Sequence, residues 1–160
     1  MDAAPERVPD ASRLLAIVTG SWKTQAVYVA ARLGLADSLA ESPRSPDALA
    51  EISGADPDAL QRLLRALATL EIVRERGDGS FELTATGALL REGTPDSLRA
   101  WVLHWGGPSW PVWGQLLHSV TTGESARSLV SGAAGFEDLA VDPQPEYAEG
   151  GVARDLERGE

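Results

Sequence analysis

The sequence contains no cysteine among its 160 residues, which excludes disulfides, thiolate nucleophiles and cysteine-based metal sites. Basic residues are scarce as well. Lys23 is the only lysine, and 24 acidic residues against 14 basic ones leave a formal net charge of -10. Nucleic acids and anionic membranes attract proteins through Lys and Arg. The charge balance therefore argues against both as partners.

Long apolar runs are also missing. The N-terminus, Met1 to Arg7, lacks the basic region and apolar run of a secretion signal, and no later stretch is apolar for long enough to span a bilayer. β-Branched and aromatic residues are comparatively few, whereas Ala, Leu and Arg are abundant. We therefore expect a cytoplasmic protein with one mainly α domain at residues 11–140.

The first helical segment, residues 14–31, reads LLAIVTGSWKTQAVYVAA and carries apolar side chains in nearly every helical direction. Such a helix needs cover on all sides, so we expect a second subunit to bury part of it. Two later helices have clear start signals, because Ser45 and Asp56 each stand before a proline at the first helical position. The helix from Pro57 to Leu70 also places leucines along one face, which predicts a core-packed amphipathic helix.

The residue pattern then changes from helical to alternating. Residues 72–76 and 80–83 flank Gly77-Asp78-Gly79, whose Asp-Gly step is expected to supply the positive φ angles of a tight hairpin. Helices followed by such a hairpin indicate a winged helix. Further helices are expected from Thr84 to Leu90, from Thr94 or Asp96 across His104, and from Pro108 or Pro111 through Val120. Residues 1–10 are expected to be flexible and residues 141–160 to form an acidic, loosely ordered tail.

Read together, these elements resemble the N-terminal dimerisation domain of S-adenosylmethionine-dependent O-methyltransferases of the actinobacterial and plant type, which act on phenols, polyketides and related small molecules. The resemblance is carried by residues 19–51 (TGSWKTQAVYVAARLGLADSLAESPRSPDALAE), 55–73, 81–99, 101–124 and 135–140 (GFEDLA). It implies an intertwined homodimer that supplies part of a substrate-pocket wall. In the family, a following Rossmann-type domain holds the methyl donor.

A Rossmann domain needs a strand, a Gly-rich turn at a helix N-terminus and then an acidic residue for the ribose. The glycine pairs of this sequence, Gly106-Gly107 and Gly150-Gly151, follow no apolar strand and lack that acidic partner. We therefore expect no cofactor and no autonomous methylation. The expected role is a stand-alone dimerisation and pocket module in natural-product biosynthesis, which could associate with a full-length methyltransferase or another biosynthetic enzyme.

The candidate site is a tryptophan-rich segment. Four of the five tryptophans lie within residues 101–113, and indoles make flat walls for an aromatic ligand as readily as they pack a dimer core. His104 stands among them as a candidate acid or base. His118 is better explained as a structural histidine, Asp96 as a helix start and Arg99 as a solvent-facing side chain. The predicted substrate-binding residues are Trp22, Trp101, Trp105, Trp110 and Trp113.

Two alternatives to a stand-alone dimerisation and pocket module remain open. The first is a methyl-donor-independent enzyme, such as a cyclase, isomerase or dehydratase, in which His104 acts as general acid or base in an aromatic pocket. The second is a winged-helix DNA-binding regulator that reads a groove with Arg62 and Arg65. Between Arg44 and Arg99, however, ten acidic residues outnumber seven basic ones, which disfavours DNA binding.

Overall fold

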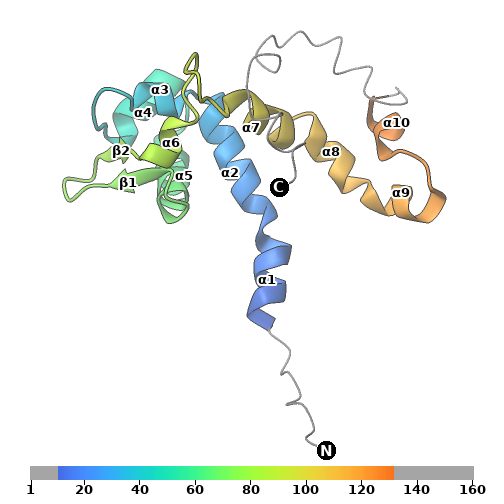
Figure 1. The fold of residues 1–160 in the computed structure, drawn as a ribbon. Helices are drawn as coiled ribbons and strands as arrows, with labels where there is room; N and C mark the ends of the chain where they lie inside the picture. The colour runs from blue at the N-terminus through green and yellow to red at the C-terminus, as the bar shows by residue number, and fades with distance from the viewer. Residues whose placement is uncertain (1–10, 132–160) are drawn as a thin grey trace, which may run out of the picture.

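The computed structural model describes residues 11–131. The expected flexible N-terminus (1–10), the acidic tail (141–160) and the 135–140 motif lie outside the described residues. Figure 1 shows a compact lobe of short helices with a hairpin, two helices crossing at the centre, and two outlying parts. No helix within residues 11–131 is both long and apolar enough to cross a membrane.

The fold is mainly helical, as the sequence predicts, with one two-stranded antiparallel sheet. Its elements follow one another along the chain as α1 (Ala11–Thr19), α2 (Ser21–Arg32), α3 (Leu35–Ser38), α4 (Pro46–Ser53), α5 (Pro57–Thr69), β1 (Val73–Glu75), β2 (Phe81–Leu83), α6 (Ala85–Ala88), α7 (Arg99–Gly106), α8 (Ser109–Gly114), α9 (Leu116–Thr122) and α10 (Ala126–Ser131).

The compact lobe contains α3 to α6 and the hairpin, and its helix starts follow the sequence signals. The Ser45 hydroxyl accepts a hydrogen bond from the Ala48 amide at 3.3 Å, and the Asp56 carboxylate accepts one from the Ala59 amide at 2.8 Å. These two side chains satisfy amide groups that a helix N-terminus leaves unpaired. The predicted starts of α4 and α5 are therefore confirmed.

The leucine face of α5 forms the centre of the hydrophobic core. Leu60, Leu64 and Leu67 are buried, and they belong to one cluster with Leu35, Leu49 and Phe81. Phe81 comes from β2, so the hairpin closes one side of this core. A further antiparallel bridge pairs Phe81 with Arg44, which ties the segment before α4 to the sheet.

The hairpin forms where the sequence predicts it, but its turn differs from expectation. Val73 pairs with Leu83, and the Gly79 amide donates a hydrogen bond to the Arg76 carbonyl at 3.0 Å. Within the described residues of this turn only Gly79 has a positive φ, of 80°, so the expectation that Asp78 would share it is wrong. The extra turn residues let Asp78 keep an ordinary backbone conformation and accept a hydrogen bond from the Ser80 amide.

Helix boundaries outside the lobe also differ from the prediction. The expected long first helix is divided at Gly20 into α1 and α2, and the expected helix through Val120 is divided at Gln115 into α8 and α9. Gly20 and Gly114 lie at these divisions, and glycine is the weakest helix former after proline. Helix α7 begins at Arg99 rather than near Asp96, with no side-chain cap.

Candidate functional site

Helix α7 is held in place by close packing against α2. A Cβ atom added at Gly106 would lie only 2.3 Å from Cβ of Tyr28, so no larger residue fits between the two helices. The Gln25 side-chain amide donates a hydrogen bond to the Gly106 carbonyl at 2.9 Å. These contacts fix the end of α7, which carries the candidate site.

Arg99 holds the other end of the same helix pair. Its Nε donates a hydrogen bond to the Ala31 carbonyl at 3.3 Å, and its Nη1 lies 2.5 Å from a carboxylate oxygen of Glu92. The side chain is only 18% exposed. Arg99 thus satisfies a carbonyl near the end of α2, and the expectation of a solvent-facing side chain is wrong. Its partner lies 68 positions earlier in the chain, so no local signal could have revealed this role.

Three of the predicted tryptophans form one aromatic cluster. Trp101 and Trp105 lie one turn apart on α7 and meet edge to face, with ring centroids 5.7 Å apart. Trp113 comes from α8 and stacks on Trp105, with centroids 5.8 Å apart and an angle of 22° between the rings. The outer members remain accessible, because Trp101 is 50% and Trp113 53% exposed. We call these three residues the indole cluster.

His104 lies beside the indole cluster and contacts Ser109. The two rings of His104 and Trp105 are perpendicular at a centroid distance of 6.3 Å. Nε2 of His104 lies 2.8 Å from the hydroxyl oxygen of Ser109, which is only 9% exposed. Ser109 was not among the predicted site residues. It reaches His104 because the chain turns at Gly107 and Pro108 between α7 and α8. The sequence predicts a helix break there, but not which side chains meet across it.

The surroundings keep His104 neutral near pH 7. Burial and, secondarily, the positive charge of Arg127 lower the pKa of His104 below the ordinary value of 6.5. A neutral imidazole can accept a proton or share a hydrogen bond with a ligand. Beside it, Nε1 of Trp105 is buried and meets no hydrogen-bond acceptor in the part of the chain that the structure describes. Buried donors of this kind are usually paired.

The other two predicted tryptophans lie apart from this cluster. Trp22, at the start of α2, is 41% exposed, and Trp110, on α8, is 37% exposed. Neither ring contacts another aromatic ring among residues 11–131. Trp22 does lie one turn before Gln25, whose side chain reaches the end of α7. The structure thus brings together Trp101, His104, Trp105 and Trp113, but not all of the predicted set.

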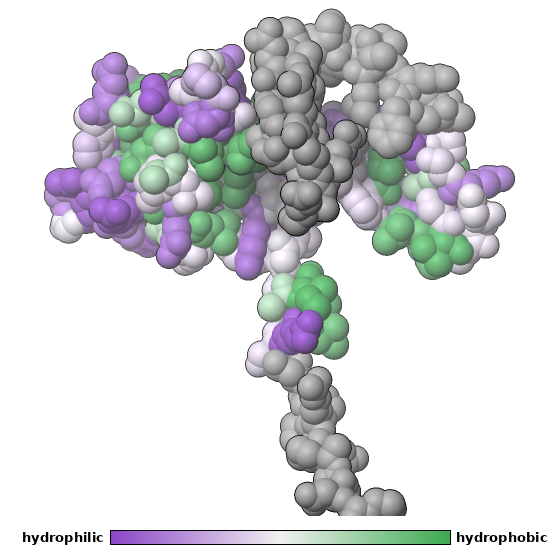
Figure 2. Space-filling view, in the orientation of Figure 1, coloured by the Kyte–Doolittle hydropathy of each residue, from purple (hydrophilic) through white to green (hydrophobic). Residues whose placement is uncertain are grey.

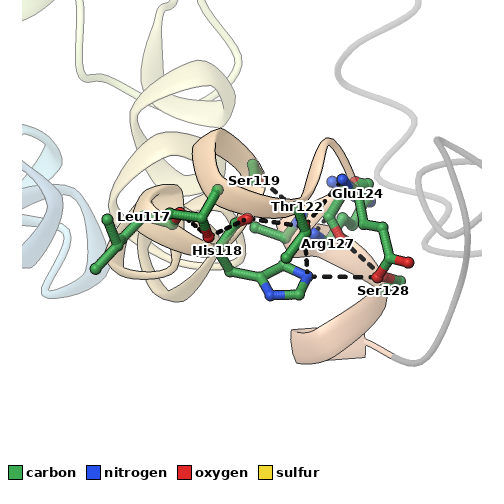
Figure 3. Close-up of polar contacts among 10 residues, drawn as sticks. Leu117, His118, Ser119, Thr122, Glu124, Arg127 and Ser128 are labelled. Atoms are coloured by element: carbon green, nitrogen blue, oxygen red, sulfur yellow. Dashed lines mark hydrogen bonds and ion pairs between the residues drawn. The ribbon is translucent and has the colours of Figure 1, made fainter.

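His118 belongs to a separate polar cluster that joins α9 to α10 (Figure 3). Its Nε2 lies 3.7 Å from a carboxylate oxygen of Glu124, and its carbonyl accepts a hydrogen bond from the Thr122 hydroxyl at 2.8 Å. The Ser119 hydroxyl accepts a bond from the Ala126 amide at the start of α10. These contacts are structural. Within residues 11–131, no group of three His, Asp or Glu side chains is arranged to hold a metal ion.

An open groove of about 430 Å³ lies on the opposite part of the molecule. It is formed by α5, β1 and the start of α6, and none of the predicted site residues lines it. The residues that line it are Ala68, Glu71, Val73, Arg74, Glu75, Thr84, Ala85 and Thr86. The groove therefore adds nothing to the candidate site.

Apolar side chains are exposed on both outlying parts of the molecule. Figure 2 shows hydrophobic surface on α1 and on the arm formed by α8 to α10. On α1, Leu14, Leu15, Ile17 and Val18 are each more than 60% exposed, and on α9 Leu117 and Val120 are about three-quarters exposed. Monomeric proteins rarely leave contiguous apolar patches of this kind uncovered. The exposed apolar surface of α1 and of the arm formed by α8 to α10 is therefore typical of a domain that associates with another subunit.

Comparison with known proteins identifies that domain. The model of the O-methyltransferase dimerisation domain matches residues 15–93. The chain is 42% identical over 137 residues to a phenazine O-methyltransferase from Lysobacter antibioticus, a match that covers 86% of this chain and 40% of that protein. It is 43% identical over 143 residues to the 3-amino-4-hydroxybenzoate 4-O-methyltransferase of Streptomyces cremeus, covering 88% of this chain and 39% of that enzyme.

A solved structure gives the same result. The crystal structure of LaPhzM superposes with a TM-score of 0.81 at 41% identity, over 88% of this chain and 42% of that one. The chain belongs to the O-methyltransferase dimerisation-domain family. It spans about 40% of the length of the curated relatives it matches, so the predicted family and fold are confirmed for this region.

Proposed function

We propose that this chain is a dimerisation and substrate-pocket module related to natural-product O-methyltransferases, and that its 160 residues pair with a second copy but do not methylate by themselves. The exposed apolar surface of α1 and α9 carries the first part of this proposal. Helix α1 contacts α2, but every residue from Ala11 to Thr19 is exposed, so little packing within one chain stabilises this helix. A second subunit that covers α1 would supply that packing.

Dimerisation is tested by light scattering on the purified chain. We expect a dimer, and we expect the double variant Leu14→Asp/Ile17→Asp to be monomeric, because it places charges on the exposed apolar face of α1. The matched control is Ile52→Asp, since Ile52 on α4 is also 54% exposed but lies in the compact lobe. A wild-type monomer, or equal effects of the two changes, would refute the proposed interface.

The indole cluster supports the pocket part of the proposal. The half-exposed faces of Trp101 and Trp113 suit a flat aromatic ring, and the relatives named above act on a phenazine and on an aminohydroxybenzoate. We infer a substituted planar aromatic ligand. The described residues form no parallel sheet with a Gly-rich turn, which supports the absence of a methyl-donor site in this region. Calorimetry should therefore detect aromatic ligands but not S-adenosylmethionine.

A second candidate function is favoured by the contact between His104 and Ser109. A neutral imidazole next to a hydroxyl can take a proton from a bound ligand, which fits a methyl-donor-independent cyclisation, isomerisation or dehydration. The test is turnover of aromatic candidates by the wild type and by His104→Ala. Turnover that depends on His104 would favour this enzyme over a non-catalytic module.

DNA binding is the weakest candidate. We propose that α4, α5 and the hairpin have a winged-helix arrangement, but their arginines lie beside carboxylates. Arg65 lies 3.7 Å from Glu75, and Arg74 and Arg76 both contact Glu82, at 2.9 and 2.7 Å. A groove-binding helix and wing need unneutralised basic groups facing the phosphates. These ion pairs add to the acidic net charge in arguing against a DNA-binding role.

A further inference from the structure

Hydrogen-bonding groups lie in and beside the indole cluster, where the His104 and Trp105 rings are 6.3 Å apart. The Ser109 hydroxyl and the His104 imidazole are in contact at 2.8 Å, and Ser109 is almost fully buried. The adjacent residue, Trp105, has a buried indole N–H with no acceptor among the described residues. Burying polar groups is costly unless they are hydrogen-bonded. A polar group on a ligand would supply the missing acceptor.

A positive charge acts on His104 although the whole chain is acidic. The sequence carries a net charge of -10, yet the charged group that acts on His104 is the guanidinium of Arg127. Arg127 reaches this region from α10, which packs against α8. A cation, the Trp105 N–H and the hydrogen-bonded pair of His104 and Ser109 beside aromatic rings match a planar ligand that bears a negative charge.

We propose that Trp105, His104 and Ser109 form the recognition site for a carboxylate group on a planar aromatic ligand, with the positive charge of Arg127 beside it. This inference rests on the proposed aromatic pocket and names the class of ligand that the pocket selects. A carboxylate offers two acceptor oxygens, and its hydrogen bonds to N–H and O–H donors are charge-assisted. One ligand group can thus accept a hydrogen bond from the Trp105 N–H and also contact the hydrogen-bonded pair of His104 and Ser109.

The ligand ring takes a place in the indole cluster. Trp113 covers one face of Trp105, is half exposed, and lies on the six-residue helix α8. A side chain so placed can move aside and let a flat ligand stack on Trp105, which brings a substituent on that ligand to the buried N–H. Stacking and anion recognition then act at the same site.

The test compares two probes that differ in charge and in one hydrogen-bonding group. 2-Naphthoate and 2-naphthamide have the same ring and nearly the same shape, but only the first is anionic at pH 7. Their binding to the 160-residue chain is measured by calorimetry and by quenching of tryptophan fluorescence. We expect 2-naphthoate to bind about tenfold more tightly or better, although the overall charge of the chain repels it.

Single substitutions locate the site. Trp105→Phe keeps an aromatic ring but removes the N–H together with the pyrrole ring of the indole, so the uncharged probe controls for lost stacking. His104→Asn removes the imidazole. Each should weaken 2-naphthoate about fivefold or more and change 2-naphthamide less than about twofold. His118→Gln, a change at the other histidine of the chain, is the control and should alter neither probe. Circular dichroism and the mass in solution confirm that each variant is folded, and Ser109→Ala is the substitute if Trp105→Phe does not fold.

The outcomes separate this inference from the proposed pocket. Equal affinity for the two probes, or equal losses for both in Trp105→Phe, would overturn carboxylate recognition and leave an aromatic pocket in place. Binding of neither probe would overturn the pocket and this inference together. A preference for 2-naphthoate that His118→Gln also abolishes would place the anion at α9 and overturn the assignment to Trp105 and His104.

Discussion

The close packing of α2 against α7 predicts the effect of one methyl group at Gly106. In Gly106→Ala, the new Cβ would lie 2.3 Å from Cβ, 2.5 Å from Cγ and 2.7 Å from Cδ2 of Tyr28. Carbon atoms prefer separations of about 3.5–4.0 Å, so α2 and α7 must separate by about 1 Å. Overpacking of this kind costs about 1–3 kcal/mol, and the better helix propensity of Ala recovers at most about 1 kcal/mol.

The assay is urea unfolding followed by circular dichroism at one protein concentration, because the stability of a dimer depends on concentration. With an m-value of about 1–3 kcal/mol per molar urea, the midpoint of Gly106→Ala should fall by about 1 M. Gly114→Ala is the matched control, since a Cβ there meets nothing within 4 Å. Its stability should stay unchanged or rise by up to about 1 kcal/mol.

The Tyr28 ring provides an internal check on the mechanism. Tyr28→Ala removes Cγ and Cδ2 but keeps the Cβ atom that would lie 2.3 Å from the new methyl group. Gly106→Ala should therefore remain destabilising in the Tyr28→Ala background. The reasoning would be refuted if Gly106→Ala and the wild type unfolded at the same urea concentration, or if Tyr28→Ala fully restored the stability of Gly106→Ala.

Three further predictions follow from single positions. Glu71 has a φ of 58°, which glycine adopts without strain, so Glu71→Gly should raise the free energy of unfolding by about 0.5–1 kcal/mol in urea titrations. Gly87→Ala should lower the thermal midpoint clearly, because its Cβ would lie 2.0 Å from the Ile72 carbonyl oxygen, a backbone atom that cannot rotate away. Because the pKa of His104 is lowered on folding, the unfolded chain binds more protons as the pH falls from about 6.5 towards the folded pKa. Stability should therefore decline over that window in the wild type, and His104→Gln, measured by denaturant titration at several pH values, should show a shallower decline.

The features that could be predicted from the sequence are those in which a residue determines the structure of its neighbours in the chain. Ser45 and Asp56 cap helices that begin at the next residue, and the leucines of α5 share a face because a helix repeats every 3.6 residues. The hairpin could be predicted from Gly77-Asp78-Gly79 and from the alternating residues on either side. The family resemblance predicted a dimer interface, and the exposed apolar side chains of α1 and α9 agree with that prediction.

The tertiary structure decided which distant groups meet. Arg99 binds the Ala31 carbonyl and Ser109 contacts His104 because α2 packs on α7 and the chain turns at Gly107 and Pro108. Composition and periodicity describe the tendency of a segment to be helical and the face it buries, but the turn and the packing between helices set the position of each side chain in space. The tryptophans could thus be singled out from the sequence, whereas the partners of Trp105 and His104, and with them the chemistry of the candidate site, required the folded chain.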